Sequence, residues 1–256
     1  RRPMVVSSIR DILQPKSAKR DLATARLVQD YFDLVLVHGD GRFSTLDETF
    51  SAARLISDKT AYTGMVAPDD AAPAVADRYD VIVSAGGGAV GEDLLRTSLA
   101  ARELTSLSTA HWLIVTGPNL PDEAVSRLQS RASDNVEIVR FRPDLATLLR
   151  QARVSVSQAG YNTVADVLQA RCASVLVPFA AHGEQEQTIR ATRLEAAGLA
   201  ISIRSHDLSP AGMARAIDAA CRQERDYPAS LLLDGAAATA GILRERHEAF
   251  KHDRSA

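Results

Sequence analysis

The sequence predicts an α/β fold in which a parallel β-sheet carries helices on both faces. From about residue 80 onward, short continuous apolar runs alternate with amphipathic helical segments, which is typical of a parallel sheet that is buried on both sides. The 256 residues are 46% apolar and 24% charged, as in a globular protein with a substantial core. Residues 67–73 contain two prolines and two acids and therefore mark a linker to an earlier α/β segment.

The expected elements follow in chain order. Short, β-branched runs predict strands at residues 5–8, 34–38, near 62, 80–84, 111–116, 136–141, 154–157, 173–177 and 199–203. Helical periodicity predicts helices at 17–32, 90–104, 122–132, 144–151, 162–171, 184–197, 209–221 and 235–250. We expect residues 1–67 to be the remnant of an N-terminal domain whose earlier part lies outside this chain. Residues 68–234 then form a second domain, and 235–256 a C-terminal helix and polar tail.

Composition disfavours several classes of protein. The net charge of −2 provides no basic surface, so nucleic acid is not an expected partner. The two cysteines, Cys172 and Cys221, lack metal-ligand spacing and favour a reducing, cytoplasmic compartment. No apolar run approaches the roughly 18 residues of a spanning helix. The sequence has no Asp-x-Asp pair, and we expect no metal and no other cofactor.

A glycine-rich turn follows the strand at 80–84. It contains Gly86, Gly87, Gly88 and Gly91 and leads directly into a helix. Glycines let the backbone approach an anion closely, and a helix N-terminus supplies unpaired N–H groups. We predict a diphosphate-binding turn here, with a tight turn that merely needs small residues as the alternative. The next strand ends without an acid for an adenosine ribose, which disfavours a dinucleotide site.

A second group of polar residues follows the strands at 154–157 and 173–177. Since parallel strands end at one edge of the sheet, the two groups are expected to meet there. A helix N-terminus, a carboxylate, amides and an imidazole together suit a ligand with a phosphate and a diol, such as a nucleotide-sugar. The residues are Gly160, Asn162, Thr163, Asp166, His182, Glu186 and Gln187. For Asp166, placed in the first turn of its helix, the alternative is a carboxylate that offsets the helix dipole.

Residues 80–200 resemble the donor-binding, C-terminal domain of glycosyltransferase family 28. The resemblance rests on the order and spacing of the glycine turn, of residues 140–144, of 160–166 and of 177–187, and residues 1–68 resemble the last strands of the family's acceptor-binding domain. It implies a GT-B type fold with two Rossmann-like domains, the first truncated here. It also implies metal-independent transfer of a hexose or N-acetylhexosamine from a UDP-sugar to an acceptor hydroxyl, with inversion.

The resemblance assigns roles on the nucleoside side of the site. Phe141 and Arg142 would border the base, largely through backbone groups, and Asp166 would hold the ribose hydroxyls. Gly160, Asn162 and Thr163 would line the phosphates.

On the sugar side, Glu186 and Gln187 would face the donor hydroxyls, with His182 leading their loop. Departures from the family's pattern leave the donor sugar open. Gly88 stands where the family usually has a phosphate-binding serine, and Glu186 replaces the first of two glutamines.

The catalytic base is less defined. His38 follows a strand and is our candidate, although a structural hydrogen-bonding role is the alternative and the main base is expected outside this chain. The acceptor would be a carbohydrate or a lipid-linked sugar. Phe43, Leu46 and Phe50 would either contact the inner face of a membrane peripherally or pack inside the first domain. Two other functions remain open: a UDP-sugar epimerase or hydrolase, and a non-catalytic nucleotide-binding scaffold.

Overall fold

The structure, a computed structural model, describes residues 2–67, 77–86, 90–180, 183–224 and 232–252. Three predicted site residues, Gly87, Gly88 and His182, lie outside these ranges. The chain divides into two compact units, one of Arg1–Ala67 with Pro228–Ala256 and one of Pro68–Tyr227. The C-terminal helix, expected as a separate segment, thus belongs with the first unit.

The second unit is built on a six-stranded sheet in the order β6-β5-β4-β7-β8-β9, and every pairing is parallel. This confirms the predicted fold class. The strands are β4 (Val81–Ser84), β5 (Trp112–Val115), β6 (Val136–Val139), β7 (Val154–Ser157), β8 (Ala173–Leu176) and β9 (Ile201–Ser202).

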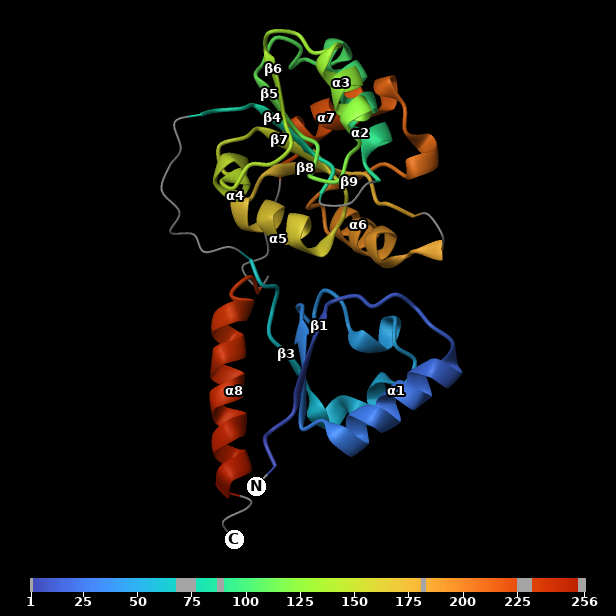
Figure 1. Ribbon diagram of the computed structural model, residues 1–256, viewed down its shortest axis with the longest axis vertical. Coiled ribbons are helices and arrows are strands. Elements are labelled where there is room, and N and C mark those ends of the chain that lie inside the picture. Colours follow the sequence, from blue (N-terminus) through green and yellow to red (C-terminus); the bar gives the residue numbers. More distant parts are fainter. Residues whose placement is uncertain (1, 68–76, 87–89, 181–182, 225–231, 253–256) are drawn as a thin grey trace. The chain divides into compact units, whose positions relative to one another are not determined.

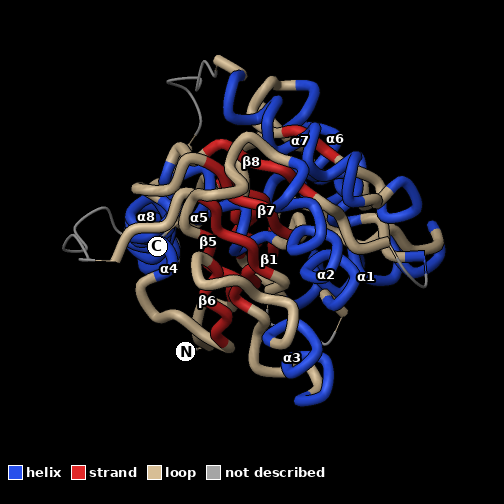
Figure 2. The backbone as a smooth tube through the Cα atoms, turned by 90° about the horizontal axis from the view of Figure 1, so that it is seen from above, coloured by secondary structure: helices blue, strands red, loops and turns tan. Residues whose placement is uncertain are grey.

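Helices cover both faces of this sheet (Figures 1 and 2). Val81 and Val83 of β4 pack into one core cluster with the helices α2, α3 and α7, whereas Ile82 faces a second cluster with α4 and α5. This alternation along a buried strand explains the continuous apolar runs in the sequence. The helices are α2 (Glu92–Ala101), α3 (Asp122–Gln129), α4 (Leu145–Leu149), α5 (Tyr161–Ala170), α6 (Glu186–Ala196) and α7 (Pro210–Arg222).

The strand order creates a switch point between β4 and β7. From β4 the chain adds β5 and β6 on one side, and it then returns to place β7 on the other side of β4. The turns that follow β4 and β7 therefore lie side by side at one edge of the sheet, and each leads into a helix. In doubly wound sheets, ligands bind at this position.

The first unit contains a three-stranded parallel sheet with β2 (Leu34–His38) between β1 (Val6–Arg10) and β3 (Thr60–Tyr62). Helix α1 (Ala18–Tyr31) and helix α8 (Gly235–His252) lie on opposite sides of it (Figure 1). Two short 3₁₀ stretches, Leu46–Glu48 and Ala53–Lys59, were not predicted.

Backbone contacts attach α8 to this unit. The Met65 amide donates to the Leu232 carbonyl at 2.8 Å, and the Gly235 amide donates to the Met65 carbonyl at 3.0 Å. A Cβ at Gly235 would lie 2.6 Å from the carbonyl oxygen of Gly64, so only glycine allows this approach.

The apolar residues considered for membrane contact lie mostly in the core. Leu46 and Phe50 are buried with Val35 and Val37 of β2, which contradicts a surface role for these two and supports the packing alternative. Across the described segments, we find no helix long and apolar enough to span a bilayer.

Candidate functional site

The two turns at the switch point differ in the space around their glycines. Gly86 has a φ of +70°, and a Cβ at Gly91 would lie 2.2 Å from the Cβ of Ala85. Close packing of α2 on the turn therefore requires a glycine at position 91. This supports the alternative that the turn is tight and merely needs small residues. A Cβ at Gly160 meets nothing within 4 Å, so the start of α5 opens onto free space, which is where an anion binds a helix N-terminus.

Asp166 lies on α5 beyond its first turn. The helix starts at Tyr161 and has no acid in its first turn, which corrects the predicted position. A helix dipole acts mainly within the first turn. The alternative that Asp166 serves to offset the dipole of α5 is therefore not supported. Burial raises the pKa of Asp166 to about 6, and none of the described residues donates a hydrogen bond or an ion pair to it. Ahead of it, Asn162 is exposed and Thr163 is half-buried.

Gln187 joins the loops that follow β7 and β8. Its Oε1 accepts from the backbone N–H of Ala159 and from that of Phe179, each at 3.1 Å. The first turn of α6 is thereby held against the turn that precedes Gly160. Gln187 therefore positions these loops through its carbonyl oxygen, and only its amide nitrogen remains for a sugar hydroxyl.

Glu186 is paired with a residue that the sequence reasoning missed. Its Oε1 accepts from Nη2 of Arg190 at 2.8 Å, while Arg190 Nη1 donates to the Ala159 carbonyl at 2.7 Å. The guanidinium also lies 5.8 Å from the centre of the Tyr161 ring. The spacing of Glu186 and Arg190, four residues apart on one helix, was the available signal.

The predicted base-binding residues have different environments. The Phe141 side chain is 69% exposed and offers an aromatic face at the end of β6. The Arg142 guanidinium instead binds Asp144 through two hydrogen bonds of 2.8 Å and Asp77 through one of 2.9 Å. These bonds raise the pKa of Arg142. Its side chain is thus engaged within the protein, which leaves backbone groups for a ligand.

His38 belongs to the first unit. Its Nε2 lies 2.5 Å from Ser8 Oγ, and its Nδ1 lies 2.9 Å from Thr63 Oγ1. Burial lowers the pKa of His38, so the imidazole is neutral at pH 7. Both ring nitrogens are engaged by hydroxyl groups, and the arrangement supports the structural alternative at least as well as the role of base.

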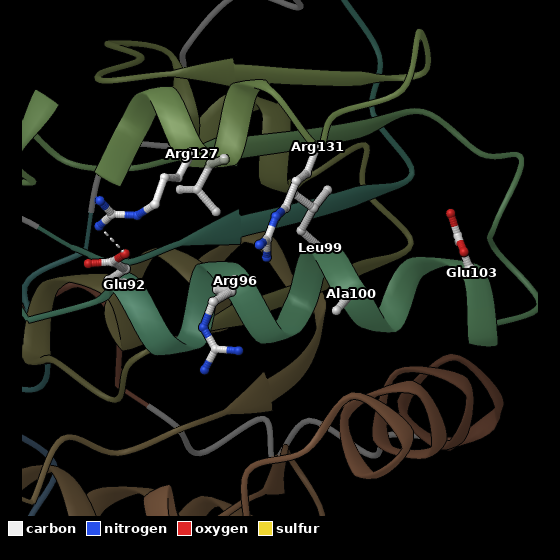
Figure 3. A pocket seen from close by; sticks show the side chains of 8 residues that line it. Glu92, Arg96, Leu99, Ala100, Glu103, Arg127 and Arg131 are labelled. Carbon is white, nitrogen blue, oxygen red and sulfur yellow. Dashed lines mark hydrogen bonds and ion pairs between the residues drawn. The ribbon is translucent and has the colours of Figure 1, made fainter. Parts of the chain in front are cut away.

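Two cavities lie in the second unit, and the larger of them adjoins both turns of the switch point. One, of about 630 Å³, opens at the carboxyl ends of the strands between Val90, Gln158, Phe179 and His206. The other, of about 330 Å³, lies between α2 and α3 (Figure 3). Three arginines and two glutamates line it, and Arg127 forms an ion pair of 2.6 Å with Glu92.

Comparison with known proteins decides the family. Residues 70–231 match the model of the glycosyltransferase family 28 C-terminal domain. The chain belongs to glycosyltransferase family 28. The resemblance seen in the sequence is thus confirmed, and the match covers the six-stranded sheet and both turns of the switch point.

The relatives of this family 28 chain include a UDP-N-acetylglucosamine–N-acetylmuramyl-(pentapeptide) pyrophosphoryl-undecaprenol N-acetylglucosamine transferase of Leuconostoc citreum. It is 31% identical over 109 residues, which are 41% of this chain and 30% of that protein. The similarity thus spans less than a third of the relative's length.

Solved structures with the same fold include the calicheamicin glycosyltransferase CalG4 and Acinetobacter baumannii MurG. CalG4 has a TM-score of 0.61 at 18% identity and covers 94% of this chain and 67% of its own. MurG has a TM-score of 0.50 at 19% identity and covers 86% and 72%, respectively. The GT-B type fold of the family 28 chain is confirmed.

Proposed function

We propose that this chain carries the donor site of a glycosyltransferase that moves a hexose or N-acetylhexosamine from a UDP-sugar to an acceptor hydroxyl. The observation that carries the proposal is Asp166, a half-buried carboxylate with no partner among the described residues and a pKa raised to about 6. A ribose diol would supply the two donors that it lacks. The family match and the open start of α5 at Gly160 support the same ligand.

The chemistry follows from the switch point. The departing diphosphate gains negative charge, and backbone N–H groups at a helix N-terminus stabilise such charge without a metal. We assign this role to the start of α5, with Asn162 and Thr163 beside it, and to the turn that includes Gly86. Attack by the acceptor from the opposite face of the sugar would invert the anomeric carbon, and a general base would take the acceptor proton. His38 stays our candidate within this chain.

The acceptor and the location are part of the proposal. The Leuconostoc citreum relative is named for a pyrophosphoryl-undecaprenol acceptor, and we propose a carbohydrate or lipid-linked acceptor here, reached in the cytoplasm at the inner face of the membrane. Cys172 and Cys221 are both free, as is usual in a reducing compartment.

Titration calorimetry with UDP and UDP-N-acetylglucosamine tests the donor site. Asp166→Ala should lose UDP affinity by at least tenfold, because ribose hydrogen bonds to a charged acceptor are each worth about 1.5–3 kcal/mol. Asp134→Ala removes an exposed carboxylate in the turn before β6 and should bind UDP normally. Equal affinity of both variants, or no nucleotide binding by the unaltered chain, would refute the site.

Product analysis with a labelled UDP-sugar separates the alternatives. A labelled acceptor with release of UDP indicates a transferase, an isomerised UDP-sugar indicates an epimerase, and free sugar indicates a hydrolase. Chelation of divalent cations should leave transfer unchanged.

A further inference from the structure

A fully buried cation lies beside the proposed sugar-binding turn. Arg190 on α6 has no exposed side-chain surface, and its ion-pair partner Glu186 is 29% exposed. A buried guanidinium is costly unless its hydrogen bonds are satisfied. Here the Ala159 carbonyl, the Glu186 carboxylate and the Tyr161 ring surround it.

The pair fixes Glu186 as an oriented anion. Arg190 holds Oε1 of the carboxylate at 2.8 Å, and among the described residues nothing bonds to the other oxygen. A carboxylate oxygen accepts hydrogen bonds, so the second oxygen of Glu186 is available to the donor groups of a ligand.

This anion lies next to the start of α5. Arg190 bonds to the carbonyl of Ala159, and Gln187 bonds to the amide of the same residue. Ala159 directly precedes Gly160, the N-cap residue of α5. The charge of Glu186 is therefore held close to the turn to which we assign the diphosphate and the sugar attached to it.

We infer that the Glu186–Arg190 pair sets the charge selectivity for the donor sugar. Glu186 accepts hydrogen bonds from the hydroxyl or amide groups of a neutral sugar and repels a sugar that carries its own carboxylate, a uronic acid. Arg190 is a positioning residue, since it is buried and acts through Glu186. The inference rests on the proposed donor site and goes beyond it by stating which class of donor sugar the site rejects.

Competition binding to the whole chain, with UDP, UDP-N-acetylglucosamine and UDP-glucuronate, tests the inference. The unaltered chain should bind UDP-glucuronate more weakly than UDP-N-acetylglucosamine, and Glu186→Gln should reduce that preference by about tenfold, because like charges repel strongly in a partly buried site. UDP itself should bind as before. The matched control, Glu184→Gln, removes an exposed acid two residues away and should retain the preference.

Loss of the Glu186 carboxylate removes a counter-charge from the buried Arg190, which can unfold the chain. The double variant Glu186→Gln with Arg190→Met removes both charges, and its unfolding temperature shows whether it folds. It should bind UDP and show the same reduced preference. If UDP binds but the preference is unchanged in both variants, the charge selectivity is refuted and the donor site stands. If UDP does not bind to the unaltered chain, both the donor site and the charge selectivity are refuted.

Discussion

Replacement of Asp166 by asparagine should stabilise the chain while it weakens nucleotide binding. Burial raises the pKa of Asp166 from 3.8 to about 6, so the ionised form is disfavoured in the folded state. At about 1.4 kcal/mol per pKa unit, the difference amounts to about 3 kcal/mol. Because the side chain is only partly buried, solvent screening reduces this to about 1–2 kcal/mol. Asparagine has the same shape and no charge, so it removes the penalty.

The effect depends on pH in a defined direction. An acid whose pKa is higher in the folded chain favours folding at low pH, and this contribution is lost as the pH rises through about 6. Asp166→Asn should therefore raise the unfolding temperature by about 3–6 °C at pH 7.5. The gain should shrink steadily between pH 6 and pH 4, where the unaltered carboxyl group is protonated as well.

Thermal unfolding at several pH values, combined with calorimetry, provides the assay. A ribose diol bonds to the ionised carboxylate, so UDP-N-acetylglucosamine should bind more weakly below pH 6 in the unaltered chain. That dependence should be absent from the residual binding of the asparagine variant. An unfolding temperature that does not rise at pH 7.5, or a gain that persists unchanged at pH 4, would refute the burial argument.

Three further predictions concern the surrounding framework. Gly91→Ala should lower the unfolding temperature by several degrees, because its Cβ would lie 2.2 Å from that of Ala85. At Gly160 a Cβ has free space, so Gly160→Ala should change the unfolding free energy by no more than about 0.5 kcal/mol. The same variant should weaken UDP binding. Gln187→Ala should cost about 1–3 kcal/mol of unfolding free energy, since two backbone N–H groups lose their acceptor, and Gln187→Glu should retain stability in the same denaturant titration. The pKa of His38 is lowered, so its contribution to folding is complete above pH 6.5 and falls as the medium becomes more acidic. The loss of unfolding free energy between pH 7.5 and pH 5, measured by urea unfolding, should therefore be smaller in His38→Gln than in the unaltered chain.

The order of elements could be predicted because the local signals agree with the tertiary structure. Strands buried on both faces read as continuous apolar runs, and the predicted strands 34–38 and 154–157 match β2 and β7 without a shift. The start of α5 was harder. Tyr161 enters the helix, and the position of Asp166 shifts to the second turn, because a glycine at the N-terminus marks a helix start only to within a residue or two.

Contacts between distant segments were beyond the reach of the sequence. The attachment of α8 depends on backbone bonds between Met65 and residues 232 and 235, and no local pattern encodes them. Arg190 was missed for a related reason. An arginine four residues after a glutamate on a helix usually forms an exposed ion pair, and only the packing of α6 against the turn at Ala159 buries it.

Three acids of this unit differ from Asp166 in that each has a cationic partner. Asp144 and Asp77 satisfy Arg142, and Glu186 satisfies Arg190. Each of these carboxylates already has a cation that stabilises its charge. Asp166 is desolvated without such compensation among the described residues, so its negative charge destabilises the folded chain when no ligand is bound. A carboxylate kept in this state is most simply explained by donors that arrive with the ligand, and the hydroxyl pair of a ribose is such a group.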